Sequence, residues 1–323
     1  MATWDLYGEL RPRAFAIAYQ MLGSVSEAED VVQEAFLRMH QTLQRDEQIN
    51  SPRAYIARLV TRLAIDQLRS ARARREQYVG EWLPEPLAIE LTPAEQAETV
   101  DSLSLAFLVL LESLTPHQRA AFLLREVFQY PYPEVAEIIG TDVDSTRHLV
   151  ARARNHVRER RPRHYASRRQ REELAQRFFA AAEQGDLPAL EELLAQDVAM
   201  HGDGGGKVPA QARPVNGRVR VARALSAGMS VLARWGVRIQ VTEVNGQPGA
   251  VAIDAHDRLV GVIALDIADG QIQTIHSIAN PDKLRHLGQV SDLGALLRAG
   301  PDPATTANHR IRRRHDRQSG GGR

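Results

Sequence analysis

Arginine and small polar side chains, placed together on one predicted helix, could contact the phosphates and base edges of DNA. The segment from Tyr132 to Arg154 reads as a short helix, a tight turn at Gly140 and a second helix. Ala136 and Gly140 lie four residues apart, where a helix-turn-helix needs a small residue and then one that tolerates positive φ. Asp142 can cap the second helix, whose first turns would meet a major groove. The residues expected at that groove are Ser145, Thr146, Arg147, His148 and Arg152. An ordinary helical hairpin is the alternative for this segment taken alone.

A second basic helix upstream offers a different kind of nucleic-acid contact. Ser51 and Pro52 mark its start as N-cap and first helical residue, and it runs to Arg75. At 100° per residue one face carries an aromatic ring and several arginines, with only Asp66 nearby to neutralise them. Such a stripe suits a nucleic-acid backbone and unstacked bases, and the alternative is a solvated basic face. The stripe consists of Tyr55, Arg58, Arg62, Arg69 and Arg72.

The helix that precedes it is acidic, which suggests a second partner of different charge. Ser24 and Glu27 form a capping box at its start. One face carries an apolar stripe at helical spacing: Val31, Val32, Ala35, Phe36 and Met39. The polar side chains that lie off this stripe, and that we expect to be exposed, are Glu29, Asp30, Gln33 and Glu34.

Composition agrees with a nucleic-acid partner. The length suggests two or three small domains, and the formal net charge is only +1, but the charge is segregated into arginine blocks and an acidic stretch. The chain has no cysteine, so it offers no disulfide and no thiolate metal site. No apolar run approaches the ~20 residues that span a bilayer, and the first residues lack the pattern of a signal peptide. We therefore expect a cytoplasmic protein with no membrane partner.

The order of these blocks resembles the bacterial sigma-70 family. AEDVVQEAF followed by SPRAYIARLVTRLAIDQLRS is similar to region 2 of that family. LTPHQRAAFLLREVFQYPYPEVAEIIG, continuing through ARAR, is similar to region 4. The short form, with nothing sizeable between the regions, resembles an extracytoplasmic-function sigma factor. Two residues depart from the usual pattern and leave the promoter sequence open: Tyr132 stands where Ser or Thr is expected, and Thr61 where Asn is common.

This resemblance implies the partners and the residues that bind them. The partners would be promoter DNA and core RNA polymerase, through its beta and beta-prime subunits. Core polymerase would bind Glu29, Asp30, Gln33 and Glu34. The −10 element would bind Tyr55, Arg58, Arg62 and Arg69, and the −35 element Ser145, Thr146, Arg147, His148 and Arg152. The resemblance implies no catalytic residue, no metal and no cofactor.

The segment between the two regions contains WLPEP, Trp82 to Pro86. Two prolines this close favour an extended path, and a capping box at Thr92 to Glu95 restarts helix. A plain linker is one interpretation. In the resembled family such linkers thread the RNA-exit and active-site channel of the polymerase, where acidic residues such as Glu81, Glu85 and Glu90 would mimic nucleic acid. Because an exposed Trp82 needs a partner surface, we expect the linker to dock.

After Arg163 the pattern changes to two helices, Arg169 to Gln184 and LPALEELLA, followed by strands. VRIQVTEV, AVAIDAHD, LVGVIALDI and QIQTIHSIA, separated by turns, predict an antiparallel meander. The order resembles the SnoaL-like superfamily, a curved sheet wrapped on helices to form a cone with an apolar pocket. The fold class expected is therefore multidomain, with two all-α helical modules and an α+β SnoaL-like cone.

Two short motifs sharpen this interpretation. DGGGK has glycines with no side chains to pack, so its backbone bends sharply or approaches something closely, and it lacks the Ser or Thr of a Walker A loop. NPDKL reads as a helix start. With WLPEP they resemble the sigma factors that carry a fused SnoaL-like domain, which implies built-in regulation without a separate anti-sigma factor. The contact residues expected are Trp82, Asp203, Gly204, Gly205, Gly206, Lys207, Asn280, Pro281, Asp282, Lys283 and Leu284.

The domains predicted are region 2 at 1–75, an acidic linker at 76–101, region 4 at 102–166, the cone at 167–290 and a mostly disordered basic tail at 291–323. SnoaL-like cones include cyclases and isomerases, so a DNA-binding protein fused to such an enzyme is the alternative function. The polar candidates for an acid–base pair are His201, Asp203, Asp254, Asp266 and His276. Catalysis needs two groups that converge on one substrate. Ligand sensing in the pocket and docking to protein remain open beside it.

Overall fold

The computed structural model describes residues 3–45, 48–87, 103–160, 167–211 and 213–295. They form two compact units. The described residues of the first unit are those up to Tyr78, then Leu83–Glu85 and 103–160; those of the second are Val79–Trp82, Pro86–Leu87 and 167–295. The linker is thus shared, because consecutive parts of WLPEP belong to different units.

The first half of the N-terminal unit is a bundle of three helices: α1 (Thr3–Leu22), α2 (Val25–Gln44) and α3 (Pro52–Glu76). Gly23, at φ 66°, ends α1, and the Ser24 hydroxyl then caps α2 by accepting from the Glu27 amide. The predicted apolar stripe of α2 is buried along its whole length. Ser51 caps α3 as expected, since its hydroxyl accepts from the Ala54 amide.

The second half of this unit contains α5 (Leu105–Leu111), α6 (Pro116–Phe122), a π-helical turn η1 (Leu123–Val127), α7 (Tyr132–Ile139) and α8 (Val143–Arg160). Thr115 and Gln118 form the reciprocal capping box of α6. Gly140 adopts φ 73° at the end of α7, and the Asp142 carboxylate accepts from the Ser145 amide at 2.7 Å. The helix-turn-helix is therefore confirmed. Helix α7 packs against both α8 and α3.

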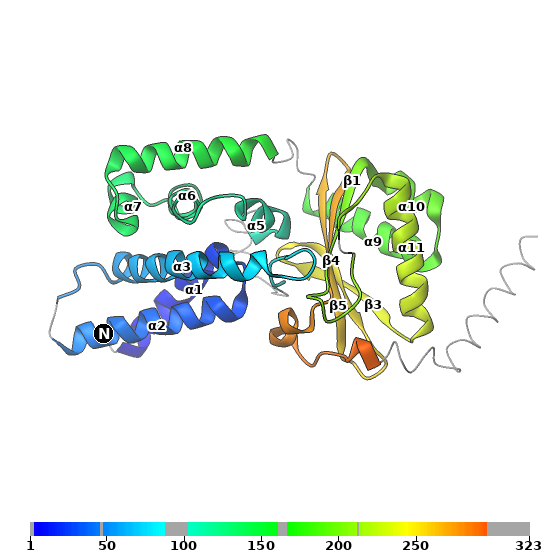
Figure 1. Ribbon diagram of the computed structural model, residues 1–323, viewed down its shortest axis with the longest axis horizontal. Helices are drawn as coiled ribbons and strands as arrows, with labels where there is room; N and C mark the ends of the chain where they lie inside the picture. Colours follow the sequence, from blue (N-terminus) through cyan, green and yellow to red (C-terminus); the bar gives the residue numbers. More distant parts are fainter. Residues whose placement is uncertain (1–2, 46–47, 88–102, 161–166, 212, 296–323) are drawn as a thin grey trace, which may run out of the picture. The chain divides into compact units, whose positions relative to one another are not determined.

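The C-terminal unit is a six-stranded mixed sheet with helices on one face (Figure 1). Its strands are β1 (Leu194–Asp203), β2 (Val215–Asn216), β3 (Arg238–Val244), β4 (Gln247–Ile253), β5 (Leu259–Ala268) and β6 (Gln271–Ile278), in the order β2-β1-β6-β5-β4-β3. The covering helices are α9 (Arg168–Gln184), α10 (Leu187–Leu193) and α11 (Arg218–Arg234). The predicted helices α9 and α10 and the antiparallel meander β3–β6 are confirmed.

Three elements of this unit were not expected from the sequence patterns above. Strand β1 pairs parallel to β6, short β2 joins its other edge, and α11 lies between β2 and β3 along the chain. Helical spacing of the buried residues Val221, Ala222, Leu225 and Met229 was the available signal for α11. The predicted helix at NPDKL is a 3₁₀ turn, η2 (Pro281–Lys283), followed by η3 (Arg285–Leu287).

Alternation along the strands separates two kinds of side chain. Val198 and Met200 of β1, Leu265 of β5 and Ile275 of β6 belong to the apolar core shared with the helices. Their neighbours in sequence therefore face the opposite side of the sheet. In the described parts of the chain, no helix is long and apolar enough to cross a membrane.

Candidate nucleic-acid interface and linker site

Helix α8 presents an exposed polar surface from the second helix of the helix-turn-helix. Arg147 donates to Asp144 at 2.9 Å, and its guanidinium lies 5.7 Å from the centre of the Tyr132 ring. Hydrogen bonds from the Ser145 side chain and amide lower the pKa of Asp142, so this cap stays ionised. The predicted residues that are exposed here are Ser145, Arg147, His148 and Arg152.

Thr146 corrects the prediction for this surface. It is fully buried, and its hydroxyl bonds the Asp142 carbonyl at 2.9 Å and the Thr141 hydroxyl at 2.8 Å. Its role in this fold is to hold the turn, so it offers no group to a base. Arg154, further along α8, is held by the Glu126 carboxylate, which raises the pKa of that arginine.

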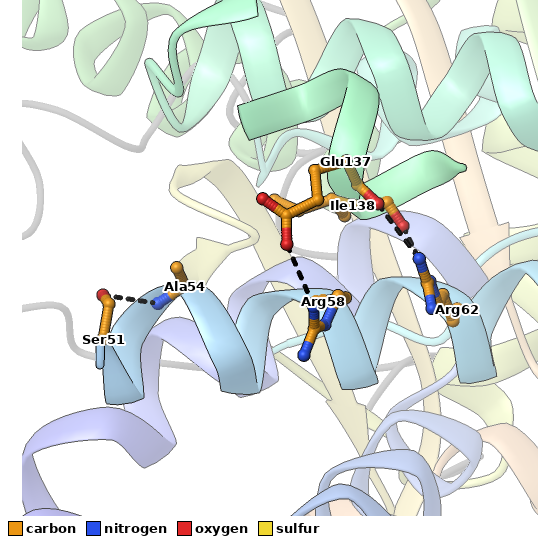
Figure 2. A network of polar contacts seen from close by, with 6 residues as sticks. All are labelled: Ser51, Ala54, Arg58, Arg62, Glu137 and Ile138. Carbon is orange, nitrogen blue, oxygen red and sulfur yellow. Dashed lines mark hydrogen bonds and ion pairs between the residues drawn. The ribbon is translucent and has the colours of Figure 1, made fainter. Parts of the chain in front are cut away.

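Two arginines on the basic face of α3 bind α7 (Figure 2). Arg58 donates to the Glu137 carboxylate at 3.0 Å, and Arg62 donates to the Ile138 and Glu137 carbonyls, also at 3.0 Å. The guanidinium of Arg58 also lies over the Tyr55 ring, 5.1 Å from its centre. Arg69 is exposed and pairs with Asp66 at 3.3 Å. Two of the four predicted −10 residues, Arg58 and Arg62, therefore already bind α7.

The exposed face of α2 carries the predicted acidic surface and one apolar residue that we missed. Asp30 and Gln33 are exposed, Glu29 pairs with Arg11 at 2.9 Å, and Glu34 pairs with Arg38 at 2.7 Å. Leu37, one turn after Gln33, is 50% exposed. At 100° per residue it lies between Gln33 and Glu34 around the helix, so the surface combines charge with an apolar contact. Its place off the buried stripe was the signal in the sequence.

Glu85 of the linker is built into the N-terminal unit. Its carboxylate accepts from the Ser24 hydroxyl at 2.9 Å and from the Val25 amide at 2.7 Å, at the start of α2. Its own amide donates to the Gly23 carbonyl at 2.8 Å, and its carbonyl accepts from the Tyr19 hydroxyl at 2.7 Å. A buried anion at a helix N-terminus is stabilised by the unpaired amides and the helix dipole. Glu85 therefore closes the corner between α1 and α2.

Trp82 of the same motif is built into the C-terminal unit. The Lys283 ammonium lies 4.1 Å from the centre of the Trp82 ring and donates to the Asp203 carboxylate at 2.7 Å. Lys283 and Asp203 are both buried. A lysine in this setting is held by a paired anion on one side and an aromatic face on the other. One cation thus joins WLPEP, DGGGK and NPDKL.

The glycines of DGGGK allow this close approach. A Cβ on Gly205 would fall 2.3 Å from the Asn280 side chain, and one on Gly206 would fall 2.9 Å from Val79 of the linker. Both glycines have positive φ, at 61° and 68°. Lys207 pairs with Asp282 across the same junction. The structure therefore brings together the predicted contact residues around Asp203, with Leu284 buried beneath and Pro281 beginning η2.

A histidine pair extends the linker site onto the sheet. Glu81 accepts from His201 Nδ1 at 2.6 Å, and the His201 ring stacks on His276 with centroids 5.4 Å apart. Full burial, with a smaller effect of His201, lowers the pKa of His276 to about 3. His276 therefore stays neutral at ordinary pH, and His201 is the member of the pair that contacts the carboxylate.

Hydrogen bonds fix the last described residues of the linker. The Leu87 amide donates to Asn245 Oδ1 and the Leu87 carbonyl accepts from the Asn245 amide, both at 2.8 Å, and the His286 ring donates to the Pro86 carbonyl at 2.7 Å. Sequence reasoning identified the turn at Asn245 but not this pairing. Glu81 and Glu85 are thus held by folded partners in the free chain, and their expected nucleic-acid mimicry within the polymerase stays a prediction. Glu90 and the Thr92 capping box lie outside the described residues.

The five residues considered for acid–base catalysis do not converge on the helix-covered interior. His201, Asp203, Asp266 and His276 alternate with core residues and face the other side of the sheet. Asp254 lies in the turn after β4, where Arg258 and Ser291 bind its carboxylate and, with two backbone amides, lower its pKa to about 2 against the effect of burial. Within the described residues no group of three His, Cys, Asp or Glu side chains could hold a metal ion.

Comparison with known proteins supports the two sigma regions expected from the sequence. The model of Sigma-70 region 2 matches residues 6–74, and the model of Sigma-70, region 4 matches residues 104–157. The ECF RNA polymerase sigma factor SigJ of Mycobacterium tuberculosis is 36% identical over 295 residues, covering 85% of this chain and 90% of that protein. This chain belongs to the extracytoplasmic-function sigma-70 factors.

Two further relatives extend the similarity beyond the sigma regions. The probable ECF sigma factor SigI of M. tuberculosis is 32% identical over 274 residues, 83% of this chain and 90% of the relative. The crystal structure of M. tuberculosis SigJ superposes with a TM-score of 0.68 at 33% identity and covers 86% of this chain and 97% of that one. The fused C-terminal domain is therefore part of the shared architecture.

Replacing Glu85 by glutamine tests the helix cap. Glu85→Gln removes the charge that meets the start of α2 and should lower the free energy of unfolding of the N-terminal unit by roughly 1–3 kcal/mol. Denaturant unfolding followed by helical circular dichroism measures it. Asp30→Asn, on the exposed face of the same helix, is the matched control and should change little. Equal stability of Glu85→Gln and the wild type would contradict the cap.

Burial of neutral His276 predicts a pH dependence. Between pH 6.5 and about 3 the unfolded chain binds a proton that the folded chain does not, so stability falls as pH falls through that window. From pH 7.5 to pH 5 the loss should be about 2 kcal/mol. Denaturant unfolding of the C-terminal unit, followed by tryptophan fluorescence, measures it. His276→Gln should flatten this dependence, whereas exposed His256→Gln should leave it unchanged; an unchanged slope in His276→Gln would refute the assignment.

Proposed function

We propose that this sigma factor directs promoter-specific initiation under the control of its own C-terminal domain, which regulates it by holding the linker between regions 2 and 4. The observation that carries the proposal is the Trp82–Lys283–Asp203 contact, supported by Glu81 on His201 and Leu87 on Asn245. These contacts make a segment of the sigma half part of the C-terminal unit. The site of action is the cytoplasm, with core RNA polymerase.

The size of this contact suits a switch. A cation–π contact contributes about 0.5–2 kcal/mol, so Trp82 alone binds weakly. Because Trp82 and Lys283 belong to one chain, their effective concentration is high. The held state can then be well populated while the contact stays reversible. Control by a domain in the same chain would take the place of a separate anti-sigma factor. A small-molecule ligand of the cone would shift this balance only by its difference in affinity for the held and released states.

The binding roles follow the exposed surfaces. Glu29, Asp30, Gln33, Glu34 and the apolar Leu37 form a surface suited to the clamp helices of the polymerase. Tyr55, Arg58, Arg62 and Arg69 would contact the melted −10 strand by stacking and phosphate binding. Ser145, Arg147, His148 and Arg152 would contact the −35 duplex from α8.

Charge reversal tests the polymerase surface. Asp30→Lys together with Glu34→Lys should weaken binding of core RNA polymerase in a pull-down, because the exposed carboxylates lie on the outer face of α2. The circular dichroism spectrum should not change, since neither side chain is in the core. Leu37→Ala should weaken binding in the same direction. Unchanged affinity in all of these variants would place the docking surface elsewhere.

Release of the linker tests the regulatory role. Trp82→Ala removes the aromatic face from Lys283 but leaves the Lys283–Asp203 pair intact, so the C-terminal unit should still fold. Run-off transcription with added core polymerase should rise toward the level of a chain that ends at Arg168. Trp82→Phe keeps a ring against the ammonium and is the matched control. A cut after Asn280 should behave differently from complete removal if NPDKL also supports the active complex.

The outcomes separate the candidate functions. Equal transcription from the wild type, both Trp82 variants and both truncated chains would remove regulation and return the C-terminal domain to an independent role, such as a small-molecule isomerase or cyclase. Absence of promoter-specific transcripts with core polymerase would reduce the chain to a DNA-binding protein fused to that domain. Raised transcription in Trp82→Ala, with the wild-type level in Trp82→Phe, is the result that supports linker control.

A further inference from the structure

Two of the side chains proposed to hold the −10 strand, Arg58 and Arg62, already bind α7 within the N-terminal unit. Figure 2 shows Arg58 reaching the Glu137 carboxylate while Arg62 points at the last turn of α7. Arg62 uses Nε for the Ile138 carbonyl and Nη2 for the Glu137 carbonyl. The first helix of the helix-turn-helix therefore binds two arginines of the basic face of α3, although Arg62 stays exposed to solvent.

The acceptors on α7 have the chemistry of a nucleic-acid backbone. A guanidinium presents a planar set of donors that fits carboxylate and phosphate alike. Glu137 supplies a carboxylate, and the C-terminal carbonyls of α7 lie at the negative end of the helix dipole. The two carbonyl acceptors, those of Glu137 and Ile138, precede Gly140. The left-handed conformation of Gly140 ends the helix and leaves those carbonyls without helical partners.

We propose that Glu137 and the C-terminal carbonyls of α7 substitute for promoter phosphates, so that region 4 masks the −10 face of region 2 in the free chain. The inference rests on the proposed −10 role of Arg58 and Arg62. It goes beyond the control by the fused domain, because every residue of this contact belongs to the N-terminal unit. The two promoter-reading modules then exclude each other until polymerase or DNA separates them.

Further arginines hold the same two halves of the unit together. Arg13 of α1 donates to the Phe128 carbonyl at 2.8 Å and lies over the Tyr130 ring, 4.9 Å from its centre. Buried Arg119 of α6 donates to the Gln20 carbonyl at 3.0 Å. These contacts set the masked arrangement, so loss of the α7 contact should shift the balance without unfolding the unit.

The strength of the mask can be estimated from exposure. The side chain of Arg58 is 32% exposed and that of Glu137 is 70% exposed, so solvent screens their ion pair. An exposed pair contributes about 0.2–1 kcal/mol, which corresponds to a change of at most about 5-fold in the balance between masked and open forms. Because affinity for a ligand of the open form scales with its population, Glu137→Gln should raise DNA affinity by up to the same factor.

The experiment uses the full-length chain and a fluorescently labelled single-stranded DNA of mixed sequence. Glu137→Gln should bind it about 2- to 5-fold more tightly than the wild type. Glu134→Gln, on the exposed side of the same helix, is the matched control and should bind like the wild type. Since the chain has no cysteine, dyes at Gln41→Cys and Asn155→Cys report the separation of the two halves by energy transfer. Glu137→Gln should increase the separated population.

The outcomes either support or overturn the mask. Tighter DNA binding together with a larger separated population, both absent in Glu134→Gln, supports it. Separation without a gain in DNA affinity overturns it, because the covered face would then not be what binds DNA. Unchanged separation overturns it as well. In the Glu137→Gln background, Arg62→Ala should lose the gain in affinity; if it does not, the −10 role of Arg62 has failed, and the mask with it.

Discussion

Residues 77–87, the described part of the linker between the two sigma regions, form no helix or strand, so their buried backbone polar groups must find partners in the folded units. Glu85 meets the corner of α1 and α2, and Leu87 pairs with Asn245. Between them Pro86 has no amide to satisfy, and its carbonyl accepts from His286. The prolines of WLPEP thus reduce the number of backbone N–H donors that need a partner along the extended path. They also prevent a helix, in which the backbone groups would bond one another.

This constraint explains why the linker and the C-terminal domain depend on each other. Trp82 is half-buried, and the Lys283 ammonium, paired with Asp203, lies against its ring. That pair is buried in turn, so removing either partner would leave an isolated charge at a cost of about 3–5 kcal/mol. The DGGGK loop needs glycine because Asn280 and Val79 occupy the space of side chains. The regulatory proposal thus rests on a site in which each part requires the others.

Arginine carries most of the contacts that would have to change on DNA binding. Arg58 and Arg62 bind α7, Arg154 binds Glu126, and Arg147 pairs with Asp144. In each case the partner is an anion or a carbonyl, which a phosphate could replace. Exposed pairs of this kind contribute little to stability, so the exchange of partners should be nearly balanced. The free chain therefore holds the arginines that we propose to bind DNA in contacts that resemble those they would make with DNA.

Local signals explain what the sequence could predict. Caps at Ser24, Ser51 and Thr115, the left-handed Gly140 and the strand-forming runs of β3–β6 depend on neighbours along the chain, and all are present. The close approach of other groups to the glycine run was also predictable, because glycine has no side chain to keep them away. Pairings across long separations were not: Glu85 with α2, Glu137 with α3, and the parallel pairing of β1 with β6 leave no periodic trace. Thr146 was misassigned because its hydroxyl serves the turn.

The most direct test of the account is hydrogen exchange of the linker in the free chain and in the complex with core RNA polymerase. In the free chain the amides of Glu85 and Leu87 donate to Gly23 and Asn245, so they should exchange slowly. Binding to polymerase should raise their exchange, because a linker that docked in the polymerase channel, as the family resemblance implies, would have to leave these partners. Fast exchange of these amides in the free chain would contradict the central claim, since the linker would then not be held. Equal protection in the complex would contradict it as well, since the contact would then be permanent.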